Sequence, residues 1–399
     1  MRADVLLPVK AGWQLVEVKS SVKVKDHHYE DAAIQAWVIE QAGVPLVSTQ
    51  IAHVDRNFVN PGGGHYKGLL KQQTIDDAIV DSKQQVPQWI RAAKQTLEGD
   101  EPDISPGTQC SDPYACPFMD YCAADESSPT GYPPSILPRR DGKKVARELI
   151  DEGYDDLRDV PEGRLENPLH QKIWRACKTG KAELDKAAAE ILRALPYPRY
   201  YLDFESINAA IPVWPDTRPY QQIVFQWSCH VESRDGSIRH DECLADGKTD
   251  PRREVAETMI KTLRKRGPVM VYNQAFEKGR IRDMAERFPD LRDSLLAIND
   301  RIFDLLPIAR NCYYHPEMMG SFSIKDVLPT IAPELDYHDM EVGDGGMAME
   351  AFAEMLQPDI SRERRAQLRD ALLAYCKLDT LAMVKLAHYF EKGYKNAKE

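Results

Sequence analysis

The sequence predicts an α/β protein with more than one compact unit, and three observations support this prediction. A chain of 399 residues is longer than one hydrophobic core usually organises. Apolar, strand-like runs alternate with helical stretches near both ends of the chain. A stretch rich in Ser, Pro and Gly, SSPTGYPPSILP, separates these parts. We therefore predict an N-terminal unit over residues 1–132, a helical connector over 133–195 and a C-terminal unit over 196–399.

Composition and charge restrict the class of protein only loosely. The chain is 43% hydrophobic and 29% charged, as is typical of folded proteins. A formal net charge of −11 excludes a uniformly basic surface but not a local groove that contacts phosphates. No apolar run approaches the roughly 20 residues that span a membrane, and MRADVLLPVK lacks the core of a secretion signal. We expect a cytoplasmic protein without a membrane segment.

The N-terminal unit begins with an α/β pattern. Strand-like runs cover residues 2–9 and 13–19, a helical stretch covers 29–42, and a further strand covers 46–54. A polar helical region follows over residues 76–97. The connector carries short helices rich in Lys, Glu and Arg.

The C-terminal unit begins at Pro198 with an abrupt change of pattern. RYYLDFES, QQIVFQWSCHV and SIRHDECLA predict three successive strands, and the short turns between them favour antiparallel pairing. A helix, the short apolar strand PVMVYN and a long helical tail over about 362–392 follow. This order is typical of a ribonuclease H-like mixed sheet with flanking helices.

Two pairs of side chains in this unit suggest a metal site. Asp203 and Glu205 lie two residues apart on an apolar strand, so they share a face. Buried carboxylates without partners are costly, and a cation would compensate them. Tyr375 and Asp379 are neighbours on one face of the tail helix, where Asp379 interrupts an apolar stripe. A solvated strand face and chance spacing are the alternative interpretations.

A third acid, Glu277, lies in the first turn of the helix after Asn273, where it could simply favour the helix dipole. Taken together, D-x-E, an acid after N-x-x-F and a late Y-x-x-x-D resemble the DEDD exonuclease superfamily in its tyrosine-bearing branch. The resemblance implies that Asp203, Glu205, Glu277 and Asp379 hold two Mg²⁺ or Mn²⁺ ions, with Tyr375 at the attacking water. It also implies 3′-to-5′ hydrolysis of DNA or RNA, with a single-stranded end favoured. Glu277 departs from the superfamily, which usually has Asp there.

Three longer motifs, FEKGRIRD, GSFSIKDVLP and YCKLDTLAMV, are similar to a bacterial family known as domain of unknown function 2779, over about residues 196–390. Within them, Ser323 and Lys325 are candidates for a substrate phosphate, although a solvated lysine is the alternative. Asp304 is a candidate to support the acidic cluster. Tyr313, Tyr314 and Phe322 could stack on bases or belong to the core.

The N-terminal unit carries a second set of candidate residues. Asp4 precedes Glu17 and Lys19, which share a strand face, and Gln35 lies on the next helix. This set resembles the restriction-endonuclease-like PD-(D/E)XK nuclease core in its RecB-like branch, where acids bind metal and Lys polarises the water. A solvated strand edge is the alternative interpretation of E-x-K.

Three cysteines, Cys110, Cys116 and Cys122, are spaced at intervals of six residues. The spacing resembles the cysteine set with which RecB-like nucleases bind a 4Fe-4S cluster, although the fourth ligand is not visible. A zinc site completed elsewhere is the alternative. No Cys precedes Cys110, and the chain begins at the strand bearing Asp4, so we expect a partial RecB-like module.

These observations predict a metal-dependent nuclease. The alternative, from another class, is a catalytically inactive nucleic-acid-binding or scaffold protein built on nuclease folds.

Overall fold

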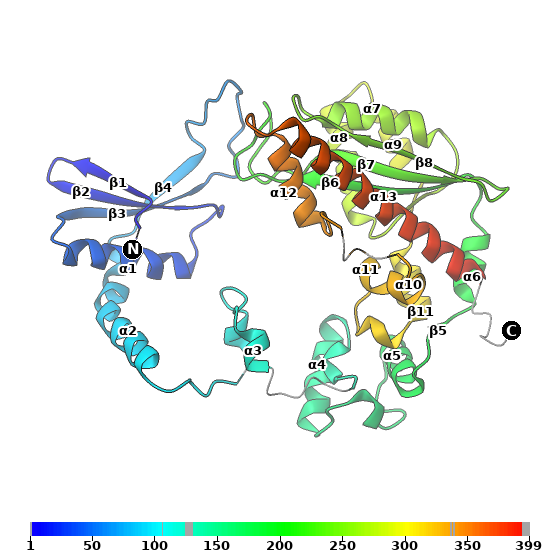
Figure 1. The fold of residues 1–399 in the computed structure, drawn as a ribbon, viewed down its shortest axis with the longest axis horizontal. Coiled ribbons are helices and arrows are strands. Elements are labelled where there is room, and N and C mark those ends of the chain that lie inside the picture. Colours follow the sequence, from blue (N-terminus) through cyan, green and yellow to red (C-terminus); the bar gives the residue numbers. More distant parts are fainter. Residues whose placement is uncertain (1, 106, 124–130, 336, 338–339, 393–399) are drawn as a thin grey trace. The chain divides into compact units, whose positions relative to one another are not determined.

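The computed structural model describes residues 2–105, 107–123, 131–335, 337 and 340–392. It has the predicted α/β class, with three sheets and flanking helices (Figure 1). The chain divides into two compact units. The first contains residues 1–128 and 208–221, and the second contains 129–207 and 222–399. Across the described residues, no helix combines the length and apolarity needed to cross a membrane.

The first unit is built around a four-stranded sheet with the order β1-β2-β3-β4. Its elements are β1 (Val5–Val9), β2 (Gly12–Lys19), α1 (Asp26–Gln41), β3 (Leu46–Val54), β4 (Leu70–Thr74), η1 (Asp77–Ile79), α2 (Val80–Glu98), η2 (Thr108–Cys110) and α3 (Met119–Ala123). β1 and β2 form an antiparallel hairpin, and β2 pairs in parallel with β3 through the crossover helix α1. The small residues of α1, such as Ala32, Ala33 and Ala36, are fully buried in the core beside Leu15 and Ile51.

A segment from the middle of the chain completes the first unit. Residues 208–221 lie between two strands of the second unit in sequence, yet they pack with residues 1–128. The buried side chain of Asn60 donates to the carbonyl oxygens of Pro212 (2.8 Å) and Trp214 (3.1 Å). The first unit is therefore discontinuous in sequence.

The second unit contains a five-stranded sheet with the order β10-β9-β6-β7-β8. Its strands are β6 (Arg199–Ile207), β7 (Ile223–Glu232), β8 (Ile238–Leu244), β9 (Val269–Val271) and β10 (Ile302–Asp304). β6, β7 and β8 are antiparallel neighbours, whereas β9 pairs in parallel with both β6 and β10. Leu202 and Phe204 of β6 point into the core under α7 (Arg252–Leu263), α8 (Ala275–Arg287) and α9 (Arg292–Asn299).

The long helix α13 (Arg362–Lys392) crosses the other face of this sheet (Figure 1). Buried polar groups of β7 fix it there. Gln226 donates to the carbonyl of Leu372 (2.8 Å), and His230 bonds the hydroxyl of Thr380 (2.8 Å). Because these partners are deeply buried, the hydrogen bonds determine how the helix is seated on the sheet.

The remaining elements of the second unit, except α12, share one core with α13, whereas α12 packs on β6 and α13. They are η3 (Pro134–Ile136), α4 (Arg139–Asp151), η4 (Leu157–Asp159), α5 (Pro168–Thr179), β5 (Glu183–Leu184), α6 (Ala187–Arg193), α10 (Leu306–Cys312), β11 (Tyr313–Tyr314), η5 (Pro316–Met318), α11 (Ile324–Val327), η6 (Leu328–Thr330) and α12 (Gly345–Met355). β5 pairs with β11, so residues 133–195 are built into this unit. Tyr313 and Tyr314 are fully buried core residues.

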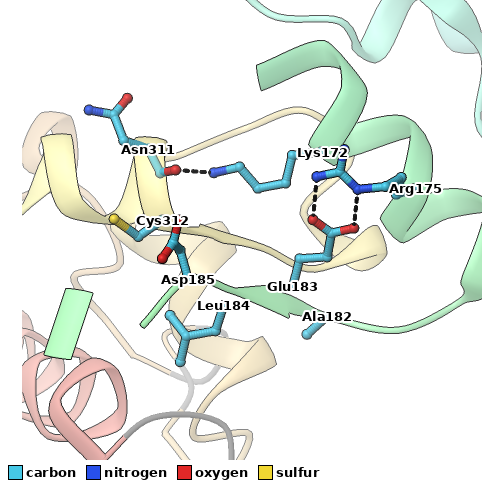
Figure 2. Close-up of a pocket in the computed structure, with 8 residues that line it drawn as sticks. All are labelled: Lys172, Arg175, Ala182, Glu183, Leu184, Asp185, Asn311 and Cys312. Carbon is cyan, nitrogen blue, oxygen red and sulfur yellow. Dashed lines mark hydrogen bonds and ion pairs between the residues drawn. The ribbon is translucent and has the colours of Figure 1, made fainter. Parts of the chain in front are cut away.

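Lys172 illustrates how this part of the unit is joined. Its ammonium, on α5, donates to the carbonyls of Arg310 (3.2 Å) and Asn311 (2.5 Å) at the end of α10 (Figure 2). Burial lowers the pKa of Lys172 to about 8. The side chain caps α10, because a cation at a helix C-terminus satisfies carbonyls that have no partner within the helix.

Candidate functional site

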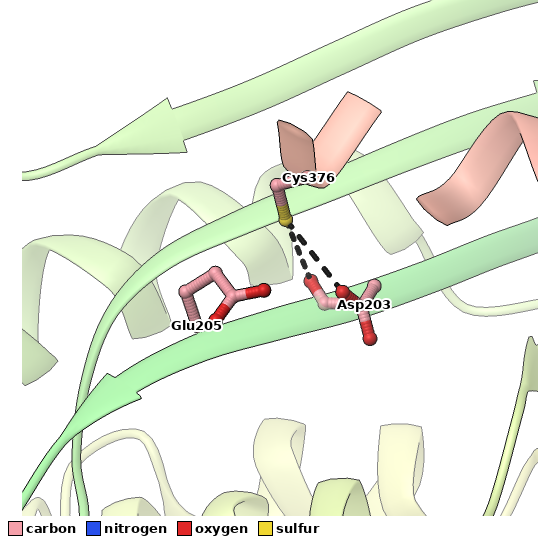
Figure 3. A group of neighbouring side chains, drawn as sticks. All are labelled: Asp203, Glu205 and Cys376. Carbon is pink, nitrogen blue, oxygen red and sulfur yellow. Dashed lines mark hydrogen bonds between the residues drawn. The ribbon is translucent and has the colours of Figure 1, made fainter. Parts of the chain in front are cut away.

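A group of potential metal ligands lies between β6 and α13. One ligand atom each from Asp203, Glu205 and Cys376 lies within 4.8 Å of the other two, the one such group found among the described residues (Figure 3). Asp203 and Glu205 share the face of β6 that α13 covers, because alternate side chains of a strand point the same way. Only 7% of Glu205 is exposed.

Cys376 was not singled out by sequence as a site residue. It is buried on α13, and its thiol lies 3.8 Å from Oδ2 and 3.9 Å from the backbone oxygen of Asp203. Burial, followed by the charges of Asp203 and Glu205, raises the pKa of this thiol well above its usual value. A signal was present, because Cys376 precedes Asp379 by three residues and therefore shares its helix face.

Asp379 and Tyr375 lie on the same helix, and a second tyrosine joins them. Tyr337 donates its hydroxyl proton to Oδ1 of Asp379 (2.8 Å). Burial raises the pKa of Asp379 to about 6, while bonds from Tyr337 and Tyr375 oppose the rise. The Tyr337 and Tyr375 rings make an edge contact, with centroids 6.2 Å apart. Tyr337 lies on a loop, and no periodic pattern in the sequence indicated it.

Glu277 lies in the first turn of α8, as predicted, and is 3% exposed. Its Oε2 is buried and has no hydrogen-bond partner in the described part of the chain. Burial raises the pKa of Glu277 to about 8. Asp304 holds the turn before α8 by accepting the backbone N–H groups of Asn273 (2.9 Å) and Gln274 (3.1 Å). Asp304 thus supports the position of Glu277 from the adjacent strand.

Lys325, on α11, is the cation that faces this cluster. Its ammonium lies 5.3 Å from the Tyr375 ring centre and 5.4 Å from the Tyr337 ring centre. It donates to the carbonyl of Gly343 (2.6 Å). Burial raises the pKa values of Glu205 and Asp379, and the charge of Lys325 partly offsets both rises. The ammonium therefore sits between two tyrosine rings and the carboxylates.

The four predicted acids interact electrostatically. Burial raises the pKa of Asp203 well above its usual range, and the charges of Asp379, Glu205 and Glu277 raise it further. Burial is also the main cause that raises the pKa of Glu205 to about 8. The structure brings the other three within interaction range of Asp203, although Asp379 and Glu277 lie outside the 4.8 Å group.

A divalent cation fits this donor set. Among described residues, none of the four carboxylates forms a salt bridge with Lys or Arg, and Glu277 retains a buried oxygen without a partner. Oxygen donors of this kind are those that Mg²⁺ and Mn²⁺ prefer. Asp203, Glu205, Asp379 and Glu277 are the residues that would hold such ions.

The first unit holds its own polar cluster on β2 and α1. Lys19 bonds Glu17 (2.8 Å) and also Asp31, and Gln35 is buried beside them. Burial lowers the pKa of Lys19, but hydrogen bonds to Asp31 and Glu17 outweigh burial and raise it. Asp31 was missed by sequence analysis, although its spacing of four residues from Gln35 places both on one helix face.

Asp4 takes a different place. It precedes β1 and is exposed, and its carboxylate accepts the backbone N–H of Val18 (2.9 Å). Asp4 therefore helps to hold β1 against β2, and no described contact joins it to Glu17 or Lys19.

Of the three clustered cysteines, Cys110 ends η2, Cys116 lies in the loop that follows, and Cys122 lies in α3. The backbone N–H of Cys116 donates to the carbonyl of Cys110 (2.7 Å), and all three thiols are half-buried. They do not form a group within 4.8 Å, whereas thiolates on one zinc ion would lie roughly 3.8 Å apart at tetrahedral geometry. Residues 2–105 and 107–123 of the first unit contain no fourth cysteine, so the donors present do not complete a four-thiolate site.

Comparison with known proteins bears on the second unit. Residues 200–323 match the family model of the Domain of unknown function (DUF2779). The predicted likeness to this family is confirmed over that range, which includes Asp203, Glu205 and Glu277. Tyr375 and Asp379 lie beyond it.

Three uncharacterised proteins are similar over longer stretches. The chain is 25% identical over 259 residues to "Uncharacterized protein UU173" of Ureaplasma parvum, covering 59% of this chain and 37% of that protein. It is 24% identical over 212 residues to "Uncharacterized protein MG366" of Mycoplasma genitalium, covering 48% and 32%. It is 27% identical over 215 residues to the homologue of MG366 from Mycoplasma pneumoniae, covering 49% and 32%. The chain spans about a third of the length of these curated relatives. No solved structure matches it.

Proposed function

We propose that the chain is a metal-dependent nuclease that hydrolyses phosphodiester bonds at the site between β6, α8 and α13. The observation that carries the proposal is the convergence of four acids from distant positions, and none of them forms a salt bridge with Lys or Arg among the described residues. Glu205, Glu277 and Asp379 are buried, and Asp203 is half-buried. A fold that brings three buried carboxylates and a half-buried one together incurs a large desolvation cost. Such an arrangement is maintained where cations and function require it.

The sheet supports the same proposal. Counted along the chain, the first strand of this sheet (β6) lies between the second (β7) and the fourth (β9), and the fifth (β10) lies beside the fourth. We take this order as support for the proposed ribonuclease H-like domain, in which the acid-bearing first strand would be central. The DUF2779 match supplies no activity, so the activity is inferred from the residues.

Each residue has a defined part in the proposed reaction. Asp203, Glu205, Asp379 and Glu277 would bind the ions, which supply Lewis acidity and a nucleophile at neutral pH. The Tyr375 hydroxyl lies beside Asp379 and would orient the attacking water. Lys325 would hold a phosphate oxygen of the substrate through its ammonium. The 3′-to-5′ direction and the preference for a single-stranded end in DNA or RNA follow from the likeness to DEDD exonucleases.

The first unit is proposed as a partial PD-(D/E)XK module with Glu17, Lys19 and Gln35 at its centre. Asp31 is added to that set by its contact with Lys19. No reaction is assigned to a 4Fe-4S cluster at the three clustered cysteines.

The proposal is tested by incubating the full chain with end-labelled single strands and duplexes of DNA and RNA, with Mg²⁺ or Mn²⁺. Metal-dependent release of nucleotides from the 3′ end is expected, and Asp203→Asn should abolish it. Asp370→Asn, an exposed acid on α13, is the matched control and should retain activity. Binding of these strands without cleavage by the intact chain would overturn the proposal and favour a binding or scaffold protein.

A further inference from the structure

A cavity of about 460 Å³ in the second unit is lined by Asn273 and Ser323, from the two short stretches of chain that also carry Glu277 and Lys325. We propose that it binds the backbone phosphate and the adjoining nucleotide of a single-stranded nucleic acid, with Arg139 and Arg310 as the phosphate ligands. This inference rests on the proposed nuclease function and names the substrate contacts of that site. The cavity is also lined by Tyr272 and Phe322. Its volume falls in the range of cavities that hold small ligands.

The cavity adjoins the acids through two short stretches of chain. Asn273 lines the cavity and lies four residues before Glu277, and its backbone N–H is held by Asp304. Ser323 lines it from the other side and lies two residues before Lys325, whose charge acts on Glu205 and Asp379. A strand whose scissile phosphate lies at the acids therefore has a neighbouring nucleotide within reach of the cavity.

The two arginines are free to bind an anion. Neither the Arg139 nor the Arg310 side chain forms an ion pair or a hydrogen bond with any residue that the structure describes. Arg310 is half-buried, which is costly for a cation without a partner. A guanidinium matches the oxygens of a phosphate with two parallel hydrogen bonds. In a chain with a net charge of −11, two uncompensated guanidinium groups in one cavity indicate an anionic ligand.

The aromatic wall of the cavity indicates the rest of the ligand. Tyr272 donates its hydroxyl proton to the carbonyl of Phe322 (2.6 Å), which fixes the two residues against each other. Phe322 is largely buried, and Tyr272 is half-buried. A fixed apolar wall next to phosphate ligands suits an unpaired base or sugar, because the paired bases of a duplex cannot leave their stack at low cost.

The arginines come from two separate parts of the chain that the fold holds together. Arg139 begins α4, in the stretch predicted to be only a connector, and adopts a left-handed φ of 68°. The loop that contains Gly320 packs closely against Ile136, just before α4. Only glycine allows this approach, because a Cβ at position 320 would lie 1.9 Å from the carbonyl oxygen of Ile136. Arg310 lies near the end of α10, which Lys172 caps (Figure 2). The cavity is therefore pre-formed by packing.

The test measures the affinity of fluorescein-labelled single-stranded DNA and RNA oligonucleotides for the full chain carrying Asp203→Asn. Anisotropy is recorded over a series of salt concentrations. Arg139→Gln and Arg310→Gln should each weaken binding about ten-fold, and each should reduce the slope of log K against log salt by about 0.7. Arg310→Lys should weaken binding less while keeping the slope, because the charge remains and only the paired bonds are lost.

Arg140→Gln is the matched control, since Arg140 is exposed, adjacent to Arg139 and outside the cavity. Melting temperatures of all variants should agree with that of the parent, which separates lost binding from lost folding. Affinity and slope unchanged in both Arg139→Gln and Arg310→Gln would overturn the inference. If the intact chain cleaves but these variants bind normally, the cavity assignment fails and the nuclease proposal stands. If binding depends on the arginines but the intact chain does not cleave, the nuclease proposal fails and the cavity assignment stands.

Discussion

The thiol of Cys376 lies 3.8 Å from Oδ2 of Asp203, at the place where α13 is seated on β6. This contact fixes the spacing between the helix that carries Asp379 and the strand that carries Asp203 and Glu205. The side chain at position 376 therefore limits how closely the acids approach one another.

Enlarging this side chain should disrupt metal binding. Cys376→Leu adds volume to a fully packed position and should cost about 1–3 kcal/mol of folding free energy. It should also lift α13 from β6 and weaken Mn²⁺ affinity, measured by isothermal titration calorimetry. Cys376→Ser keeps the size and should bind Mn²⁺ nearly as the parent does. Tight Mn²⁺ binding by Cys376→Leu would show that the spacing is unimportant.

Stability without metal should fall as the pH rises from about 4.5 to 8. Burial raises the pKa values of Glu205 and Glu277 to about 8 in the folded chain, against 4.5 for an ordinary Glu. The folded state then binds more protons than the unfolded state across that window, so the free energy of unfolding decreases with pH. Each pKa unit corresponds to about 1.4 kcal/mol, which makes the loss easy to detect by urea unfolding in EDTA.

Millimolar Mn²⁺ should remove most of this decrease, because the cation replaces the protons as the counter-charge. The variant Glu205→Gln/Glu277→Gln should show a smaller decrease of stability with pH, to which Asp203 and Asp379 still contribute, and should lose the stabilisation by Mn²⁺. A parent chain whose stability in EDTA rises between pH 5 and 8 would contradict the assignment of these two carboxyls.

Tyr337 should affect the pKa of the Asp379 carboxyl. Burial raises the pKa of Asp379 to about 6, and the hydrogen bond that the Tyr337 hydroxyl donates to Oδ1 partly offsets this rise. Tyr337→Phe removes the bond, so the pKa should rise, and the acidic limb of the pH–activity profile should move to higher pH. The profile of kcat on a labelled oligonucleotide measures this shift. Tyr375→Phe should instead lower kcat across the whole profile, because its hydroxyl is proposed to orient the water. Identical profiles for Tyr337→Phe and the parent would contradict the role of Tyr337.

The regular elements could be predicted from the sequence, whereas several site residues could not. The strand expected over residues 46–54 is β3, and the three strands after Pro198 are β6, β7 and β8. Short runs rich in β-branched and aromatic residues predict strands, and β6 and β7 are largely buried. β4 was missed, since LKQQT is entirely exposed and carries no apolar pattern. Tyr337 and the packing of residues 208–221 on the first unit depend on contacts between distant parts of the chain, which no local pattern records.

Asp304 should act as a positioning residue for Glu277. It accepts backbone N–H groups from Asn273, Gln274 and Leu306, and so holds the turn that starts α8. Asp304→Ala leaves these donors without a partner and should cost about 1–3 kcal/mol of stability. It should also weaken Mn²⁺ binding through displacement of Glu277. Asp304→Asn keeps an acceptor oxygen, so it should retain part of the stability and part of the Mn²⁺ affinity. Equal Mn²⁺ affinity in the parent and Asp304→Ala would show that Glu277 is held by other contacts.

In the full chain, the first unit should contribute no cleavage of nucleic acid. Lys19 is engaged by Glu17 and Asp31, while Asp4 is used by the backbone of Val18. A nuclease of the PD-(D/E)XK type needs two acids and a free lysine at one metal. Asp4 does not reach Glu17 in the described contacts, and the Lys19 ammonium is not free. Asp203→Asn/Asp379→Asn should therefore abolish metal-dependent cleavage of labelled DNA and RNA. Residual cleavage that disappears on adding Lys19→Met would instead assign a second active site to the first unit.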